Sequence, residues 1–368
     1  MGCKKRLRSA SGAFCCKRLR MMGVRRRWTS RKTEPTSEEE KPDIEKNLPA
    51  SSSSCSQSSQ ISYAAMDPEA ALANPHDAAR WLRDFKNAGD GTAKPDMFMI
   101  RRLRQLIWLQ TERQIFGENE QCWMRTQCVD RGGGVRDTID QVAPQLRVEV
   151  IECDILERAG QLHRSEGYSV AVLNMASPHS PGGGFRSGAG AQEENLFRRS
   201  DLFKFLHSSA YPIKDTACLV SPGVTILRGK EQDGYPFLEK TFPVTVLTCA
   251  ALQHPTLTRD RRYLPRDEKR MRMKIRALLD GAKLAGCDAC IFSAFGCGAF
   301  GNPPEEVAHL FREELLKRGL KQVSFCIFND HNAGRRHNPR GNFTPFWETF
   351  RDLMDLPGAE IGQSETGP

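Results

Sequence analysis

The sequence predicts an α/β domain of three layers, with helices on both faces of a sheet. Short runs rich in apolar and β-branched residues alternate along the chain with longer segments whose apolar residues recur at helical spacing, a pattern typical of this architecture. Two of the short runs lead directly into glycine-rich segments, at the strand ends where open α/β sheets bind their ligands. With 368 residues, 39% of them hydrophobic, the chain can form a sizeable core.

Each predicted element follows from its local pattern. Helices are predicted where apolar residues fall on one face, at residues 77–85, 97–113, 267–285 and 304–318. Strands are predicted at residues 148–151, 168–173, 224–227, 244–248, 289–292 and 323–328. We expect Asn174 to end the second of these strands, because it breaks the apolar run.

The ends of the chain differ from its middle in composition. The first 33 residues hold twelve Lys and Arg and no acid, so subtracting them from the net charge of +9 leaves −3. Residues 34–62 are acidic and then Ser-rich, which is typical of a disordered linker. We therefore expect a tail over residues 1–62, a helical extension over residues 63–145, the main domain over residues 146–355 and a short tail over residues 356–368.

The basic tail allows several interpretations. Its Lys and Arg clusters are typical of nuclear import or of nucleic-acid contacts, an Arg-rich start without acids is typical of a mitochondrial transit peptide, and a solvated tail without a receptor explains them equally well. Because the rest of the chain is slightly acidic, direct reading of DNA is not expected. We expect a monomeric intracellular protein, nuclear or cytoplasmic, with mitochondrial targeting as an alternative, and no membrane-spanning helix.

The most informative segment is residues 174–200, NMASPHSPGGGFRSGAGAQEENLFRRS. Three glycines allow the backbone positive φ and close approach to a ligand, so their N–H groups are predicted to form an anion site. Glu193 and Glu194 are adjacent, so on a helix they would point about 100° apart. One of them is therefore expected to do chemistry while the other holds a substrate. A flexible turn followed by an acidic first helical turn is the competing interpretation.

The order GGG, seven further residues and QEE resembles the signature of poly(ADP-ribose) glycohydrolases of the compact microbial type, whose catalytic unit is a macrodomain. A second segment, SAFGCGAFGNPP at residues 293–304, resembles the other glycine-rich ligand loop of that family. The similarity extends over residues 100–352. It implies a macrodomain with a mixed sheet and a hydrolase that reverses ADP-ribosylation, as in the DNA damage response, acting on poly(ADP-ribose) and ADP-ribosylated proteins.

The resemblance also implies a role for each matching residue. Glu194 is the expected catalytic acid, and Glu193 is expected to bind hydroxyls of the ribose whose bond is cut. Asn174 and Phe300 are expected to contact a ribose. The other expected substrate-binding residues are Gly182, Gly183, Gly184, Phe185, Gln192, Gly296, Gly298, Ala299 and Gly301, with Phe185 as a pocket wall and Gln192 as a residue that shapes the loop or contacts the ligand.

The implied reaction needs neither a metal nor a cofactor. A ribose–ribose bond breaks through an oxocarbenium-like transition state once its leaving oxygen is protonated, and the ionised acid then takes a proton from the attacking water. A catalytically silent ADP-ribose reader is the alternative function, although such a reader should lack Glu194. Whether cleavage occurs at the end of the polymer or inside it stays open.

Other chemistry-bearing residues have plainer interpretations. Asp154 follows a predicted strand and either contacts adenine, as the resemblance implies, or caps a helix. The thirteen cysteines are scattered and odd in number, which favours reduced thiols. Cys287 and Cys290 form a single CxxC with no second pair at zinc-finger spacing, so we expect them to be packing residues.

Overall fold

The computed structural model describes residue 63 and residues 67–89, 94–117, 123–131, 146–329 and 338–354. All of these belong to one compact unit, residues 59–368. The tails expected at residues 1–62 and 356–368 lie outside the described residues. In the described part of the chain, no helix combines the length and the apolar character that crossing a bilayer requires.

The described residues form a seven-stranded mixed sheet in the order β1-β4-β5-β3-β6-β7-β2. Its five neighbouring strands from β5 to β2 run parallel, and β4 is antiparallel both to β5 and to the edge strand β1. The strands are β1 Gln127–Asp130, β2 Arg147–Ile151, β3 Val170–Met175, β4 Ala217–Arg228, β5 Phe237–Cys249, β6 Ala289–Phe292 and β7 Gln322–Cys326.

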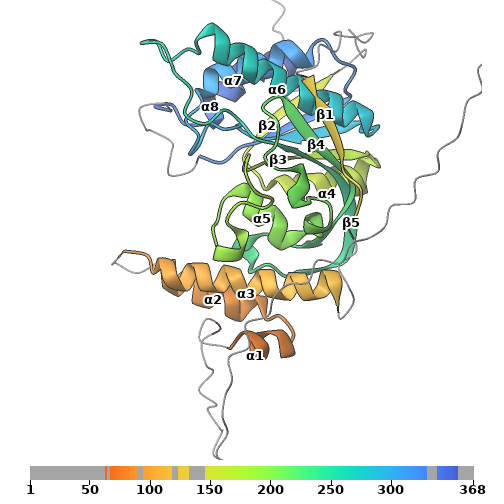
Figure 1. The fold of residues 1–368 in the computed structure, drawn as a ribbon, viewed down its shortest axis with the longest axis vertical. Coiled ribbons are helices and arrows are strands. Elements are labelled where there is room, and N and C mark those ends of the chain that lie inside the picture. The colour runs from red at the N-terminus through yellow and green to blue at the C-terminus, as the bar shows by residue number, and fades with distance from the viewer. Residues whose placement is uncertain are drawn as a thin grey trace, which may run out of the picture. The chain divides into compact units, whose positions relative to one another are not determined.

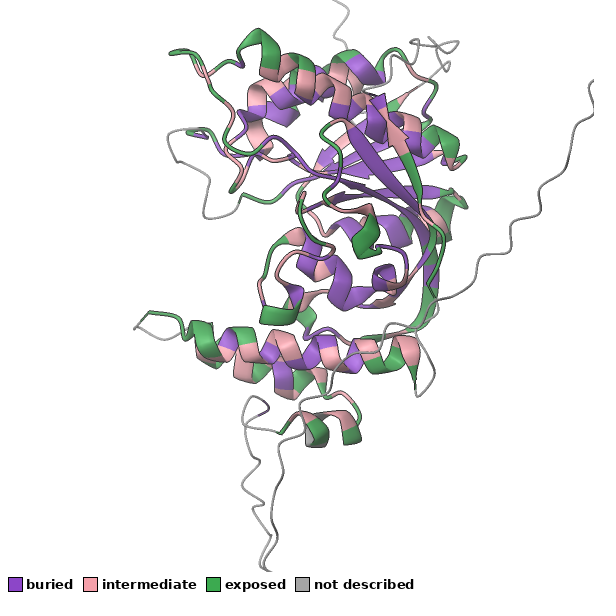
Figure 2. Ribbon diagram, viewed as in Figure 1, coloured by how far each residue is buried: buried purple, intermediate pink, exposed green. Residues whose placement is uncertain are grey.

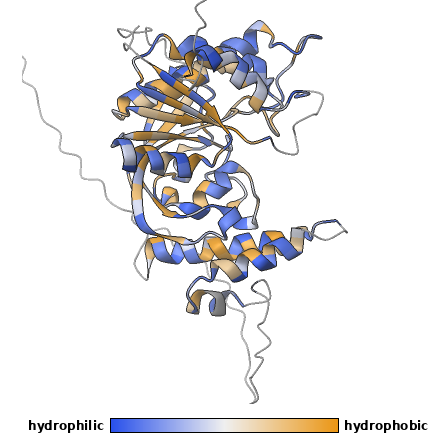
Figure 3. Ribbon diagram, turned by 180° about the vertical axis from the view of Figure 1, so that it is seen from behind, coloured by the Kyte–Doolittle hydropathy of each residue, from blue (hydrophilic) through white to orange (hydrophobic). Residues whose placement is uncertain are grey.

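Helices cover both faces of this sheet, so the predicted α/β/α architecture is confirmed (Figure 1). One face carries α4 (Ile155–Glu166) and α5 (Gln192–Arg199), and the other carries α6 (Pro265–Leu284), α7 (Pro304–Leu315) and α8 (Phe343–Phe350). The central strands are buried almost throughout, as Figure 2 shows. These strands consist largely of hydrophobic residues (Figure 3). Such continuous hydrophobic runs are typical of strands that are covered on both faces. Cys287 and Cys290 both lie in this core.

Two features of the sheet differ from the sequence-based expectations. Strand β3 continues through Asn174 to Met175 because these residues pair in register with Thr248 and Cys249 of β5. Strand β1 lies in the range expected to be a helical extension. Its four residues are too few to show a period, and pairing with β4 stabilises it.

The segment before β1 contains α1 (Pro68–Ala73), α2 (Ala78–Gly89) and α3 (Met97–Phe116). A small second core holds α2 and α3 together, formed by Tyr63, Trp81, Leu103, Leu106, Ile107 and Tyr235. Within it, the Trp81 indole donates to the Leu103 carbonyl at 3.0 Å. Helix α3 also reaches α5, because the Thr111 hydroxyl donates to the Arg198 carbonyl at 2.8 Å. The extension therefore packs against the helix that carries the two glutamates.

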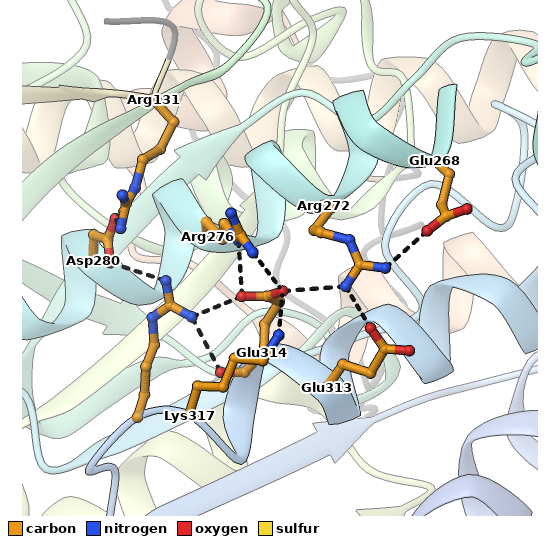
Figure 4. Close-up of polar contacts among 9 residues, drawn as sticks. Arg131, Glu268, Arg272, Arg276, Asp280, Glu313, Glu314 and Lys317 are labelled. Atoms are coloured by element: carbon orange, nitrogen blue, oxygen red, sulfur yellow. Dashed lines mark hydrogen bonds and ion pairs between the residues drawn. The ribbon is translucent and has the colours of Figure 1, made fainter. Parts of the chain in front are cut away.

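A cluster of charges joins α6 to α7 (Figure 4). Glu314, whose side chain is 1% exposed, accepts from Arg276 and Arg272 of α6 and from Lys317 and Arg318 just beyond α7. Although burial raises the pKa of Glu314, the hydrogen bonds from Arg276, Arg318 and Lys317 outweigh it and bring the pKa down to about 2. The carboxylate is thus ionised at neutral pH and holds the two helices on this face of the sheet together.

Candidate active site

The site is built around Asn174, at the carboxyl end of the central strand β3. Its side chain is fully buried, and its amide nitrogen donates to the Thr248 hydroxyl at 3.2 Å and to Glu193 Oε1 at 3.5 Å. Its amide oxygen is buried without a protein partner in the described structure. A buried acceptor without a hydrogen bond costs about 1–3 kcal/mol of stability, so Asn174 is positioned to accept a hydrogen bond from a ligand.

The three glycines turn the chain tightly against the two glutamates. Gly182 has φ +74° and Gly183 has φ +53°, both in the left-handed region that favours glycine. A Cβ on Gly183 would lie 2.6 Å from Glu194 Oε1 and 3.1 Å from Glu193 Oε2. Only glycine therefore lets this loop approach both carboxylates.

Glu193 is buried and held by three donors. Its carboxylate accepts from the Ser177 N–H at 2.7 Å and the Gly182 N–H at 3.1 Å, besides the weaker contact with Asn174. Burial, assisted by the neighbouring Glu194 charge, nevertheless raises the pKa of Glu193 to about 7. Both carboxylate oxygens of Glu193 are thus held by hydrogen bonds, and the group is close to half-protonated at neutral pH.

Glu194 has a different arrangement. Its Oε1 accepts from the Gly184 N–H at 2.9 Å, whereas its Oε2 is buried and has no partner in the described structure. The side chain is therefore fixed at one oxygen and open at the other. A carboxyl group held in this way can present a proton to a ligand atom.

The glycine N–H groups are used differently from what the sequence predicts. Those of Gly182 and Gly184 donate to the two glutamates, and that of Gly183 donates to the Ser180 carbonyl at 3.3 Å. The anions that this loop holds are thus the protein's own carboxylates. The expected anion site for a ligand is not formed by these three N–H groups.

Gln192 and Phe185 lie behind the site. The Gln192 amide donates to the Leu173 carbonyl at 2.7 Å and accepts from the Met175 N–H at 2.8 Å, so it fastens the start of α5 to β3. Of the two roles expected for Gln192, the structure thus supports shaping the loop. Phe185 is only 4% exposed and packs against Trp108 and Phe197. Phe185 therefore supports the loop from the side of the core and exposes little surface to a ligand.

The second glycine-rich loop follows β6. Gly296 and Gly301 both have positive φ, and the Asn302 N–H donates to the Gly296 carbonyl at 3.1 Å, closing the loop. Three successive N–H groups, those of Gly298, Ala299 and Phe300, have no protein acceptor among the described residues. Successive free N–H groups in such a turn suit an anion. The half-buried Phe300 ring lies at the same loop.

Asp154 caps a helix, as one of its two interpretations predicts. Its carboxylate accepts from the N–H groups of Leu156 and Glu157 at the start of α4. It also forms a two-pronged ion pair with the buried Arg199, at 2.7 and 2.8 Å. Both oxygens are thus occupied by protein donors that join α4 to α5.

Two further residues of the site lie outside the set of site residues predicted from the sequence. Ser177 positions Glu193 through its backbone N–H, and a backbone contact of this kind cannot be predicted from the type of side chain. The Tyr211 hydroxyl is buried without a partner, and burial together with the Glu193 charge raises the pKa of Tyr211. Tyr211 lies far along the chain from the glycine-rich motif, so only the fold brings it near Glu193.

Comparison with known proteins agrees with this geometry. Residues 107–229 match the family model described as microbial-type PARG, catalytic domain. This range includes Asn174, the three glycines and both glutamates, and ends before the second glycine-rich loop. No match was found among curated protein sequences.

Several solved structures resemble the chain. The poly(ADP-ribose) glycohydrolase (PARG) of Thermomonospora curvata is 26% identical with a TM-score of 0.51, and the match covers 74% of this chain and 97% of that one. The enzyme of Deinococcus radiodurans, in complex with ADP-ribose, is 29% identical over 57% of this chain and 86% of that one, with a TM-score of 0.48. The part of this chain that holds both carboxylates thus matches the microbial-type poly(ADP-ribose) glycohydrolase catalytic domain, and the chain is similar to the T. curvata enzyme over nearly the whole length of that enzyme.

Proposed function

We propose that the chain hydrolyses ribose–ribose O-glycosidic bonds of poly(ADP-ribose) and releases ADP-ribose, with Glu194 as the catalytic acid. The observation that carries the assignment of Glu194 is its unpartnered, buried Oε2, beside a Glu193 whose two oxygens are already held. An acid must have an oxygen free to reach the leaving atom.

The steps of the proposed reaction follow from this difference between the two glutamates. Protonated Glu194 gives its proton to the leaving ribose oxygen, and the bond between that oxygen and the anomeric carbon breaks through an oxocarbenium-like transition state. Water adds to the anomeric carbon, and its proton passes to the ionised Glu194, which restores the acid. A positioned acid of this kind contributes roughly 10²–10⁴-fold in rate.

The surrounding groups bind and orient the substrate. The free amide oxygen of Asn174 is positioned to accept a hydrogen bond from a ribose hydroxyl, and Glu193, whose oxygens each accept one backbone N–H, can accept a second hydrogen bond from another hydroxyl. The unpaired N–H groups of Gly298, Ala299 and Phe300 suit a diphosphate, and the Phe300 ring packs on a ribose. Fixing the substrate on both sides of the bond turns its binding energy into orientation at the reacting carbon.

The competing function is that of a reader that binds ADP-ribose without cutting the polymer. Incubation of the purified protein with poly(ADP-ribose), followed by chromatography and mass measurement of the product, separates the two. We expect ADP-ribose from the wild type and from Glu69→Gln, a matched change at an exposed acid of α1. Polymer binding with no product from the wild type would leave only the reader.

The cellular role extends this proposal. We expect a monomer that acts inside the cell on poly(ADP-ribose) attached to proteins, in the nucleus or cytoplasm, with mitochondria as the alternative suggested by the Arg-rich N-terminus. Imaging of the tagged full chain, with and without residues 1–33, distinguishes these compartments. An unchanged distribution after removal of that segment would exclude it as an address.

A further inference from the structure

The helix that follows β3 and the helices that follow its two neighbours lie on opposite faces of the sheet. Strand β3 leads into α5 on one face of the sheet, whereas its neighbours β5 and β6 lead into α6 and α7 on the opposite face (Figure 1). In open α/β sheets, ligand crevices form outside the carboxyl ends of strands where the connections diverge in this way. The fold therefore places one crevice between β3 and β6 and a second between β3 and β5.

The first crevice is the site described above, between the two glycine-rich loops. The second is a cavity of about 610 Å³, within the range of about 300–1,000 Å³ typical of small-molecule sites. It is lined by residues that follow β3, precede β4, follow β5 and begin α6, and neither Glu193 nor Glu194 is among them. Its charged and imidazole side chains include His179, Asp215, His254, Arg266, Arg270 and Lys274.

The cavity is suited to an anionic ligand. Arg270 and the buried Lys274 are held in place by Asp215, at 2.8 and 3.0 Å respectively. Arg266 is exposed and makes no ion pair with any described residue. The first turn of the 20-residue helix α6 also lines the cavity, and its Asp267 pairs with Arg270 at 3.1 Å, so three cations face two carboxylates on the cavity wall.

The two crevices share two of their walls. Pro178 and His179 line the cavity and lie between Ser177 and Gly182, both of which donate to Glu193. On the other wall, the His254 N–H donates to the Phe300 carbonyl at 2.8 Å, which ties the β5 loop to the second glycine-rich loop. The two crevices are therefore neighbours along the carboxyl edge of the sheet.

We infer that the cavity between β3 and β5 is a second subsite, which binds the ADP-ribose unit on the leaving-group side of the bond being cut. This inference rests on the proposed function, because a polymer substrate must continue beyond the unit that becomes the product. That unit lies between the two glycine loops, so the next one leaves on the β5 side. Its diphosphate and adenosine meet the cationic groups and the imidazoles of the cavity.

The test compares two charge reversals on the same helix of the full-length protein. Arg266→Glu changes the cavity, and Lys269→Glu changes an exposed residue of α6 that does not line it. The Kd of an ADP-ribose trimer and of ADP-ribose itself is measured by calorimetry in a Glu194→Gln background, which removes the proposed acid. The KM and kcat for the polymer are measured in the active protein.

We expect Arg266→Glu to raise the trimer Kd and the polymer KM by about five- to tenfold at low salt, since an exposed charge near a phosphate acts over about one Debye length. The ADP-ribose Kd and kcat should stay within about twofold of the parent values, as should every constant of Lys269→Glu. Equal effects of the two reversals, or a trimer that binds no tighter than ADP-ribose, would overturn the subsite while leaving hydrolysis intact. Failure of the proposed function would instead appear as polymer that stays uncut by the protein with Glu194 in place.

Discussion

Glu193 and Glu194 are identical neighbours whose surroundings separate their roles. Glu193 lies between the N–H groups of Ser177 and Gly182, while Glu194 is held at one oxygen and free at the other. Among carboxyl pairs, such differences in environment commonly distinguish the acid from its partner. The raised pKa belongs to Glu193, yet its oxygens are occupied, so we assign proton donation to Glu194 on geometry.

The buried Glu193 carboxyl makes stability depend on pH. Its pKa is about 7 in the folded protein against an ordinary 4.5, so between these values the folded state binds more protons and stability falls as pH rises. The loss amounts to something on the order of 3 kcal/mol by pH 8. We expect Glu193→Gln to remove this dependence, as measured by urea unfolding at pH 5 and pH 8. The Glu69→Gln protein serves as control, and a Glu193→Gln protein with the wild-type slope would contradict the prediction.

At the scale of elements, helix α3 braces the loop that leads to the two glutamates. Gly188 and Gly190 lie directly against α3, where a Cβ would collide with the Arg101 carbonyl and the Arg104 guanidinium respectively. Thr111 then links α3 to the Arg198 carbonyl at the end of α5. Although α3 lies outside the three layers, it thus fixes the segment that contains the proposed acid.

Substitution of Gly188 tests this contact. Gly188→Ala and Gly223→Ala both place alanine at positive φ, +75° and +78°, but only Gly188 has atoms in the way. We expect about 1–2 kcal/mol of destabilisation from the backbone conformation in each. For Gly188 we expect in addition at least a tenfold loss of kcat, because the loop must move off α3. Equal stability and kcat for the two variants would show that α3 is not a brace.

A second prediction at this scale concerns α6 and α7. The pKa of Glu314 is held near 2, so its contribution to stability is complete above about pH 4.5 and is lost as pH falls toward 2. Glu314→Gln should cost about 2 kcal/mol at pH 7, because several cations lose a buried partner. Glu313→Gln, at a 55% exposed neighbour that contacts only Arg272 of this cluster, should cost less than about 0.5 kcal/mol in the same denaturant titration. Equal losses would contradict the role of burial.

At the scale of the whole molecule, the sequence predicts the layers better than the fine geometry. The alternation of strands and helices correctly predicts the α/β/α arrangement, because burial on both faces imposes apolar runs. Periodicity cannot reveal that β3 pairs through Asn174, since partner strands lie far along the chain. Nor can it show where the N–H groups of Gly182 and Gly184 point, because that depends on folding the loop back onto α5.

The described residues belong to one compact unit, residues 59–368, which we expect to fold and act without the residues before it. We expect a chain that begins at residue 59 to keep the Tm and kcat of the full chain, because its cores and both ligand loops are intact. Thermal unfolding and polymer hydrolysis of the two chains side by side measure this. A Tm lowered by more than about 4 °C would indicate that the first 58 residues contribute about 2–3 kcal/mol to stability.

The most direct measurement is the single-turnover rate of polymer cleavage by Glu194→Gln, with polymer affinity determined on the same sample. Glutamine keeps the size of the side chain and cannot act as the acid, so we expect a loss of roughly 10²–10⁴-fold in rate. Affinity should stay within about threefold, since the substrate contacts remain. A Glu194→Gln protein that cleaves at the wild-type rate, while Glu193→Gln does not, would reverse the roles of the two glutamates.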